Sequence, residues 1–135
     1  FFLRNQKCLL TGDHIMDGST VVIAPPDGSM RAYLDSLELL KNYDIEKFAP
    51  GHGNFMDDPM KTIDSISRHR MTRERKVLRN IETHPNLTLD ELLPYVYSDV
   101  PEQLFPIAKM SLMAHLIKLV EDNRVKCIEN IYSLI

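Results

Sequence analysis

The first fifty residues alternate short apolar runs with polar loops. Residues 7–11 and 20–23 are apolar or β-branched runs bounded by Gly and Asp, a pattern that predicts strands. Pro25-Pro26-Asp27-Gly28 predicts a turn. Residues 45–49 predict another strand, which ends at Pro50-Gly51-His52-Gly53. This part of the chain is therefore expected to form strands joined by tight loops.

Helical periodicity appears between and after these strands. Ser29 can cap a helix whose apolar positions recur at helical spacing from Met30 to Leu40. A second, long helix is expected to start with Asp57 or Asp58 as its cap and Pro59 in its first turn, and to end at 84–86 (His-Pro-Asn). A strand–helix–strand order of this kind points to an α/β layer.

The last fifty residues carry further helix signals and a hairpin signal. The segment 88–91 (Thr-Leu-Asp-Glu) fits a capping box. An apolar stripe runs from Leu104 to Leu119, with Pro106 tolerable only in the opening turn. Residues 124–128 and 131–134 flank Glu129-Asn130 like a β-hairpin. Two or three helices followed by a hairpin is the order of a winged helix.

These elements divide the chain into three expected parts. Residues 1–57 would form a partial α/β layer, residues 58–85 a connecting long helix, and residues 86–135 a winged-helix-like domain. The start, Phe1-Phe2-Leu3-Arg4, resembles the middle of a strand. We therefore expect the chain to be cut from a longer protein.

Composition narrows the class of protein. The 135 residues are 44% hydrophobic and 26% charged, with a formal net charge of −3, which argues against a chain that mainly grips a polyanion. We find no apolar run approaching the roughly 20 residues that span a bilayer, so we expect no membrane partner and a cytoplasmic location. Cys8 and Cys127 fit no metal or redox spacing and are expected to behave as small hydrophobes.

Two short segments could carry chemistry. Asp13 follows a strand and a glycine, and His52 stands between two glycines at the end of another strand. Ligands of α/β sheets gather at the carboxyl ends of strands, so both groups could face one crevice. Carboxylate and imidazole are what a hydrolytic site for zinc or a related transition metal requires. An ordinary turn aspartate and an ordinary loop histidine are the alternative.

Several segments, in order, resemble a known family. The stretch 9–14 (Leu-Leu-Thr-Gly-Asp-His), the following 18–22 (Gly-Ser-Thr-Val-Val) and 50–53 (Pro-Gly-His-Gly) resemble the last two metal-binding motifs of the metallo-β-lactamase superfamily. The stretch 66–74 (Ile-Ser-Arg-His-Arg-Met-Thr-Arg-Glu) and a winged-helix-like tail resemble the lactamase-beta-like protein 2 group, which is typified by a metal-dependent endoribonuclease. The resemblance implies the C-terminal part of an αββα sandwich followed by an α-rich winged-helix-like domain.

The resemblance also implies a site and a reaction. Asp13 would bridge two metal ions, expected to be zinc, and His52 would ligate one of them. His14 would lie in the second shell or face the substrate, unless it is simply a buried, hydrogen-bonded histidine. The reaction would be hydrolysis of a phosphodiester or a (thio)ester by metal-activated water, with RNA or a small-molecule ester or thioester as substrate.

The chain departs from the family in one respect that matters. The family motif His-x-His-x-Asp-His, which supplies the other ligands, precedes the bridging aspartate, and this sequence contains no His-x-His. No catalytic set is complete in this chain. We therefore expect it to bind zinc weakly or not at all and to be inactive by itself. An uncovered sheet face would favour a homo-oligomer.

The basic helix and the tail leave other functions open. Arg68, Arg73 and Arg75 lie on the long predicted helix and could contact RNA, or could belong to a solvated face laced with ion pairs. A non-catalytic winged-helix module for interaction or nucleic-acid binding is the alternative function. Its would-be recognition helix offers only Lys109 and Lys118, so DNA is not the expected partner. His115 lies on the apolar stripe and is expected to be a core histidine with one partner.

Overall fold

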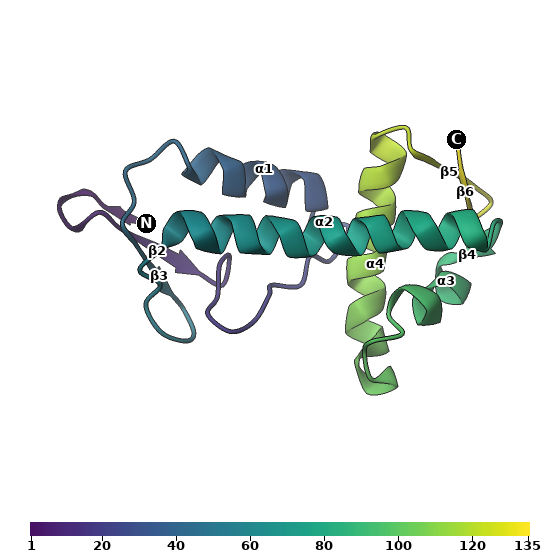
Figure 1. Ribbon diagram of the computed structural model, residues 1–135, viewed down its shortest axis with the longest axis horizontal. Helices are drawn as coiled ribbons and strands as arrows, with labels where there is room; N and C mark the ends of the chain where they lie inside the picture. The colour runs from purple at the N-terminus through teal and green to yellow at the C-terminus, as the bar shows by residue number, and fades with distance from the viewer. The chain divides into compact units, whose positions relative to one another are not determined.

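A computed structural model describes residues 1–135 of the chain (Figure 1). The elements, in order, are β1 Phe2–Leu3, a 3-10 turn Arg4–Gln6, β2 Cys8–Gly12, α1 Met30–Leu40, β3 Lys47–Pro50, α2 Pro59–Thr83, β4 Leu87–Thr88, α3 Leu89–Val96, a 3-10 turn Glu102–Leu104, α4 Phe105–Glu121, β5 Val125–Ile128 and β6 Ile131–Leu134. They form two compact units: Phe1–Val21 with Leu34–His69, and Val22–Tyr33 with Arg70–Ile135. The boundary passes through α1 and α2. The part boundaries expected at 57 and 85 remain a prediction.

The first unit contains a three-stranded sheet of order β1-β2-β3. β1 pairs antiparallel with β2, while β2 and β3 run parallel. Parallel neighbours need a crossover between them, and α1 lies within this one. The predicted strands at 7–11 and 45–49 are confirmed as β2 and β3. Because β2 and β3 point the same way, the loops that follow them leave the same edge of the sheet.

The strand predicted at 20–23 is wrong. These residues form no regular structure, although Ile23 is buried. A β-branched run becomes a strand only when another strand offers it a ladder of hydrogen bonds, and none pairs with this segment. The turn predicted after it is confirmed, since the Gly28 N–H donates to the Ala24 carbonyl at 2.8 Å.

The predicted helix starts are confirmed by their caps. The Ser29 hydroxyl accepts from the Ala32 N–H at 3.2 Å at the start of α1. The Asp58 carboxylate accepts from the Lys61 N–H at 3.0 Å at the start of α2. Each cap satisfies a backbone donor that the first turn leaves without a partner. α2 ends at Thr83, just ahead of the expected stop at 84–86.

The second unit has the winged-helix order of elements. Thr88 and Glu91 form a reciprocal capping box at the start of α3, as predicted. α4 carries a proline in its opening turn, also as predicted. The hairpin turn has positive φ at both Glu129 (50°) and Asn130 (64°), which suits the twist of its strands. β6 also pairs with β4, a two-residue strand that the sequence did not reveal, in a sheet of order β4-β6-β5.

One core stabilises this second unit. It is built from one face of each helix and the first residue of β5; its fully buried members are Val77, Ile81, Leu92, Val96, Leu112, Leu116, Leu119 and Val125. Helical spacing in α2, α3 and α4 places these side chains on facing stripes.

The expectation about apolar length needs correction. The segment Glu102–Glu121 is long and apolar enough, by length and composition only, to cross a membrane. A single helix of this kind is weak evidence, because the core helix of a soluble protein meets the same criterion. The expectation rested on one apolar face from Leu104 to Leu119, whereas α4 is apolar on its other side as well.

Candidate functional site

The parallel pair β2–β3 brings Asp13 and His52 together. Gly12, the last residue of β2, is paired with Pro50, the last residue of β3. Asp13 and His52 follow these positions, and the Asp13 Oδ1 lies 3.4 Å from the His52 Nε2. Both side chains are open to solvent, with 66% and 76% exposed. The two side chains therefore lie together at one edge of the sheet, as the rule on strand ends predicts, while the expectation that both face one crevice remains a prediction.

The glycines on either side of His52 allow this approach. The Gly51 N–H donates to the Gly12 carbonyl at 2.8 Å, and a Cβ on Gly51 would lie only 3.0 Å from the Asp13 Oδ1. Gly53 has φ +92°, and a Cβ there would come within 2.6 Å of the Asp17 Cβ. A larger residue at either position would push the two loops apart.

A second polar contact fastens the two loops to each other. The Asp17 Oδ2 accepts from the Asn54 backbone N–H at 3.1 Å and from the Asn54 side-chain amide at 3.2 Å. Within the first strand loop, the Thr11 hydroxyl donates to the Ile15 carbonyl at 2.8 Å. The loop after β2 is therefore tied both to itself and to the loop after β3. These contacts hold Asp13 and His52 in place without using either side chain.

His14 is turned toward α1. Its Nε2 lies 2.8 Å from the Ser36 hydroxyl. Burial lowers the pKa of His14, so the imidazole is neutral at pH 7. Two roles fit this position equally well: His14 could orient the loop that carries Asp13, or it could contact the substrate. The role of His14 therefore remains a prediction.

The pair fits a metal only in part. Zinc bonds of about 2.0–2.2 Å at a tetrahedral angle place two ligand atoms roughly 3.4 Å apart, which matches the separation of Asp13 and His52. No group of three or more His, Cys, Asp or Glu side chains in the chain could hold a metal ion. Zinc sites use three or four protein ligands, so the chain presents half of such a site.

A cavity of about 470 Å³ lies beside the two loops. Residues 16–20 form one wall, and Lys61, Ser65 and His69 of α2 are among the side chains on the other. Asp17 belongs both to this wall and to the contact with Asn54. A cavity of this size can accept a small molecule or one nucleotide.

The three arginines proposed for RNA differ in their surroundings. Arg73 forms a two-pronged ion pair with Asp99 at 2.8 and 3.0 Å and donates to the Val96 carbonyl at 2.9 Å. Its guanidinium also lies 4.5 Å from the centre of the Tyr97 ring. Hydrogen bonds from Arg73, and from Lys76, hold the pKa of Asp99 well below its usual range. Arg68 and Arg75 are exposed and better placed to meet a phosphate.

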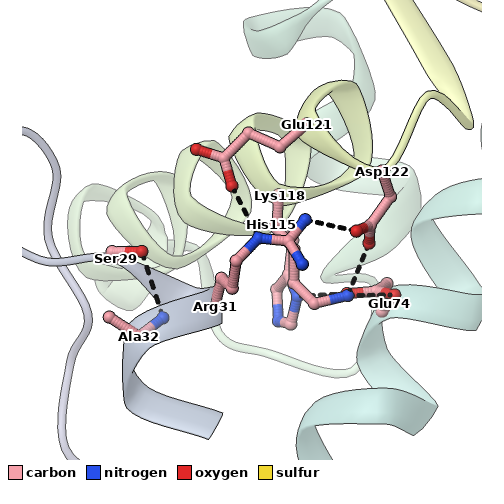
Figure 2. A network of polar contacts seen from close by, with 8 residues as sticks. All are labelled: Ser29, Arg31, Ala32, Glu74, His115, Lys118, Glu121 and Asp122. Carbon is pink, nitrogen blue, oxygen red and sulfur yellow. Dashed lines mark hydrogen bonds and ion pairs between the residues drawn. The ribbon is translucent and has the colours of Figure 1, made fainter. Parts of the chain in front are cut away.

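A buried charged network crosses the second unit (Figure 2). Lys118 donates to Glu74 at 3.1 Å and to Asp122 at 2.8 Å, and Asp122 in turn pairs with Arg31. The buried His115 has its Nδ1 3.8 Å from Glu74, too far for a hydrogen bond but close enough for an electrostatic contact. The prediction that His115 is a core histidine is confirmed, but the expected hydrogen-bond partner is missing from its Nδ1.

Charge balance governs the protonation of this network. Burial would raise the pKa of Glu74, but the nearby His115 and Lys118 outweigh it and lower the pKa. Burial lowers the pKa of His115, so the ring is neutral at pH 7. The network was not predicted from the sequence. Helical spacing could have predicted that Glu74 is buried, because it shares a face of α2 with Val77 and Ile81.

Both lysines of α4 are engaged in ion pairs. Lys109 pairs with Asp90 at 2.6 Å, and the side chain of Lys118 is only 12% exposed beside Glu74 and Asp122. Phosphate contacts supply much of the affinity for nucleic acid. The helix in the recognition position of this winged helix therefore offers little to a DNA backbone.

Known proteins resemble the chain in both parts. Residues 88–130 match the family model described as Beta-lactamase associated winged helix domain. A Beta-lactamase-like protein 2 homolog of Drosophila melanogaster is 30% identical over 124 residues, which are 90% of this chain and 41% of that protein. An Atrochrysone carboxyl ACP thioesterase of Aspergillus chevalieri is 24% identical over 133 residues, 93% of this chain and 42% of that protein.

A solved structure shares the fold over the whole chain. A metallo-beta-lactamase family protein from Thermus thermophilus has a TM-score of 0.85 at 19% identity, covering 100% of this chain and 44% of that one. The chain spans about two fifths of the length of the curated relatives it matches. The expected α/β fold, part of a sandwich followed by a winged helix, is confirmed. In sequence and in fold, the chain is similar to the C-terminal part of metallo-β-lactamase superfamily proteins.

Proposed function

We propose that the protein to which this chain belongs is a metal-dependent hydrolase, with Asp13 and His52 as two of its metal ligands. The observation that carries the proposal is the 3.4 Å separation of the Asp13 Oδ1 and the His52 Nε2 at one edge of the sheet. The donor set favours zinc, because carboxylate oxygen and imidazole nitrogen both bind it well. Two ions are expected, and Asp13 and His52 would be among the residues that hold them.

The chain's own residues would prepare the site. Metal ions, when bound, would supply an activated water and polarise the scissile bond. Asp13 and His52 would hold them, and the contact between Asp17 and Asn54 would keep the two loops at a fixed separation. Gly51 leaves room for the Asp13 carboxylate. Such outer contacts orient ligands and strengthen metal binding.

The substrate class we propose is a phosphodiester or a (thio)ester. The similarity to the Beta-lactamase-like protein 2 homolog favours RNA, through the resemblance to the endoribonuclease group, and the similarity to an ACP thioesterase favours a thioester. The cavity beside the loops has room for either a nucleotide or an acyl group. Arg68 and Arg75 would contact the RNA backbone in the first case.

Metal titration of the chain tests the ligand pair. We expect weak zinc binding by the wild-type chain in calorimetry and no turnover of a single-stranded RNA or a thioester, since the other ligands are absent. Loss of a residue that only orients a metal ligand typically weakens metal binding roughly 10- to 100-fold. Asp13→Asn and His52→Gln remove ligands themselves, so each should weaken zinc binding by more than that.

His84→Gln serves as the matched control, because His84 belongs to the second unit, where it stacks on Tyr95, and its loss should leave zinc affinity unchanged. Zinc binding that is measurable in the wild type and equally strong in both ligand variants would refute the assignment of Asp13 and His52. Robust turnover by the wild-type chain would refute the expectation that it is inactive alone.

A further inference from the structure

α4 is apolar on two opposite sides. One side enters the core of the second unit through Leu112, Leu116 and Leu119. The other side carries a row of five apolar side chains that we call the outer stripe: Ile107 (45% exposed), Met110 (38%), Met113 (37%), Ile117 (44%) and Val120 (37%). At about 100° per residue the stripe faces away from the core. A helix that is hydrophobic all round is normally buried all round.

The outer stripe is large for a free surface. Together, its five residues expose about as much surface as two fully exposed large residues, which is roughly 400 Å². An exposed apolar patch of this size is often functional. No charged side chain interrupts its centre, because Lys109 is paired with Asp90 and Lys118 is turned inward. The stripe therefore suits neither a nucleic acid nor an anionic membrane surface, both of which bind through exposed cations.

The stripe is complementary to itself. If two copies of α4 lie antiparallel about a point near Met113, Ile107 of one copy faces Val120 of the other, and Met110 faces Ile117. In a two-fold symmetric interface, if one residue of the first copy contacts a second residue of the other copy, the reverse contact is also made. The outer stripe meets this requirement. The antiparallel arrangement also sets the helix dipoles in opposite directions, which is favourable.

Charges at the two ends of the helix agree with this arrangement. Glu102 lies just before α4 and Arg124 just after it, and both are exposed and form no ion pair within the chain. In the antiparallel pair, Glu102 of each copy comes near Arg124 of the other. A parallel pair would instead bring like charges together at both ends, which is unfavourable.

We propose that this chain forms a two-fold symmetric dimer through the outer stripe, with the α4 helices antiparallel. A standard interface covers about 800 Å² per partner, so the stripe supplies its apolar centre and the polar ends of α4 its rim. An interface with so small an apolar centre gives a dimer that dissociates on dilution. This surface differs from the sheet face at which the sequence predicts self-association.

Sedimentation equilibrium of the chain over a range of concentrations tests the proposal. The wild type should move from the monomer mass of 15.6 kDa toward twice that mass as concentration rises. Met113→Glu places two carboxylates near the symmetry axis and should raise the dissociation constant at least about tenfold. Ile117→Lys is a second stripe variant with the same expected result, and circular dichroism checks that each variant is folded.

Two control variants separate the outer stripe from other apolar surfaces. Leu39→Glu changes an exposed leucine (55%) of α1 and should leave the dissociation constant unchanged. Leu10→Glu changes an exposed leucine (43%) of the sheet and should also leave it unchanged. A loss of dimer in Leu10→Glu but not in the stripe variants would overturn the proposal in favour of the sheet face.

A charge exchange tests the antiparallel arrangement itself. Glu102→Arg and Arg124→Glu should each weaken the dimer, and the double variant should regain the wild-type dissociation constant. Failure of the double variant to recover would overturn the antiparallel arrangement. A wild-type chain that stays monomeric at every concentration, or that binds phosphatidylcholine vesicles as a monomer, would overturn the dimer.

Discussion

The carboxylate of Glu74 and the ammonium group of Lys118 lie 3.0 Å apart inside the second unit, where their side chains are only 4% and 12% exposed. The pair joins α2 to α4, and Asp122 and Arg31 extend it toward solvent (Figure 2). Each of these two charges compensates the other, because burying either one without an opposite charge nearby would cost much free energy.

Removing one member of this pair should destabilise the chain strongly. Glu74→Ala leaves the largely buried Lys118 with Asp122 as its only carboxylate partner and should lower the free energy of unfolding by about 3 kcal/mol in urea denaturation. Glu82→Ala, an exposed glutamate of the same helix, is the control and should change it by less than about 0.5 kcal/mol. Equal effects of the two substitutions would contradict the account of a buried pair.

The network should also make stability depend on pH. Burial lowers the pKa of His115 from the ordinary 6.5, so the unfolded chain binds a proton that the folded chain resists, and stability falls as pH drops below about 6.5. The charges facing His115 are Glu74, Arg70 and Lys118. The pKa of Glu74 is lowered in the folded state, so its contribution is present above about 4.5 and is lost as pH falls further.

Unfolding midpoints between pH 7.5 and 5 check this dependence. The midpoint of the wild type should fall across this range, and His115→Gln should flatten the curve. His14 also has a pKa lowered by burial, so His14→Gln should remove a smaller share of the slope. A slope unchanged by His115→Gln would show that another group dominates.

The helix cap at Thr88 offers a simpler test of local structure. Its hydroxyl accepts from the Glu91 N–H, and Thr88→Ala removes that acceptor. The free energy of unfolding should drop by about 1 kcal/mol. Thr88→Ser keeps the hydroxyl and should stay close to the wild type, whereas an equal loss in both variants would point to packing of the methyl group instead.

Local rules account for the parts of the fold that sequence could predict. Ser29, Asp58 and Thr88 cap helices because each satisfies a backbone donor a few residues away, and Glu129-Asn130 makes the hairpin turn by its own backbone preference. The position of Asp13 beside His52 also followed from a general rule about strand ends.

Tertiary contacts decide the parts that sequence could not predict. Thr20–Ile23 has strand-forming residues but no partner strand, and β4 is too short to leave a pattern. Arg31 contacts Asp122, which lies 91 residues further along the chain, and local residue spacing cannot predict such a contact. The missed features therefore depend on whether a contact with a distant part of the chain is made, as for Arg31, or is absent, as for residues 20–23.

The glycines around His52 lead to a last prediction, on the separation of the two site loops. Gly53→Ala adds a Cβ within 2.6 Å of the Asp17 Cβ at φ +92°, so it should both strain the backbone and displace the loop that carries Asp13. Gly18→Ala is the matched control, because its φ is also positive (+72°) but nothing lies within 4 Å of the added Cβ.

Both variants should lose about 1 kcal/mol of stability from the backbone alone. Only Gly53→Ala should lose more than that and also weaken zinc binding in calorimetry, because only there does the new methyl group push Asp13 and His52 apart. Zinc affinity that falls equally in both variants would mean that loop flexibility, and not the contact at Asp17, controls the separation of the two ligands. Unchanged affinity in both would mean that the approach of the loops has no bearing on the metal site.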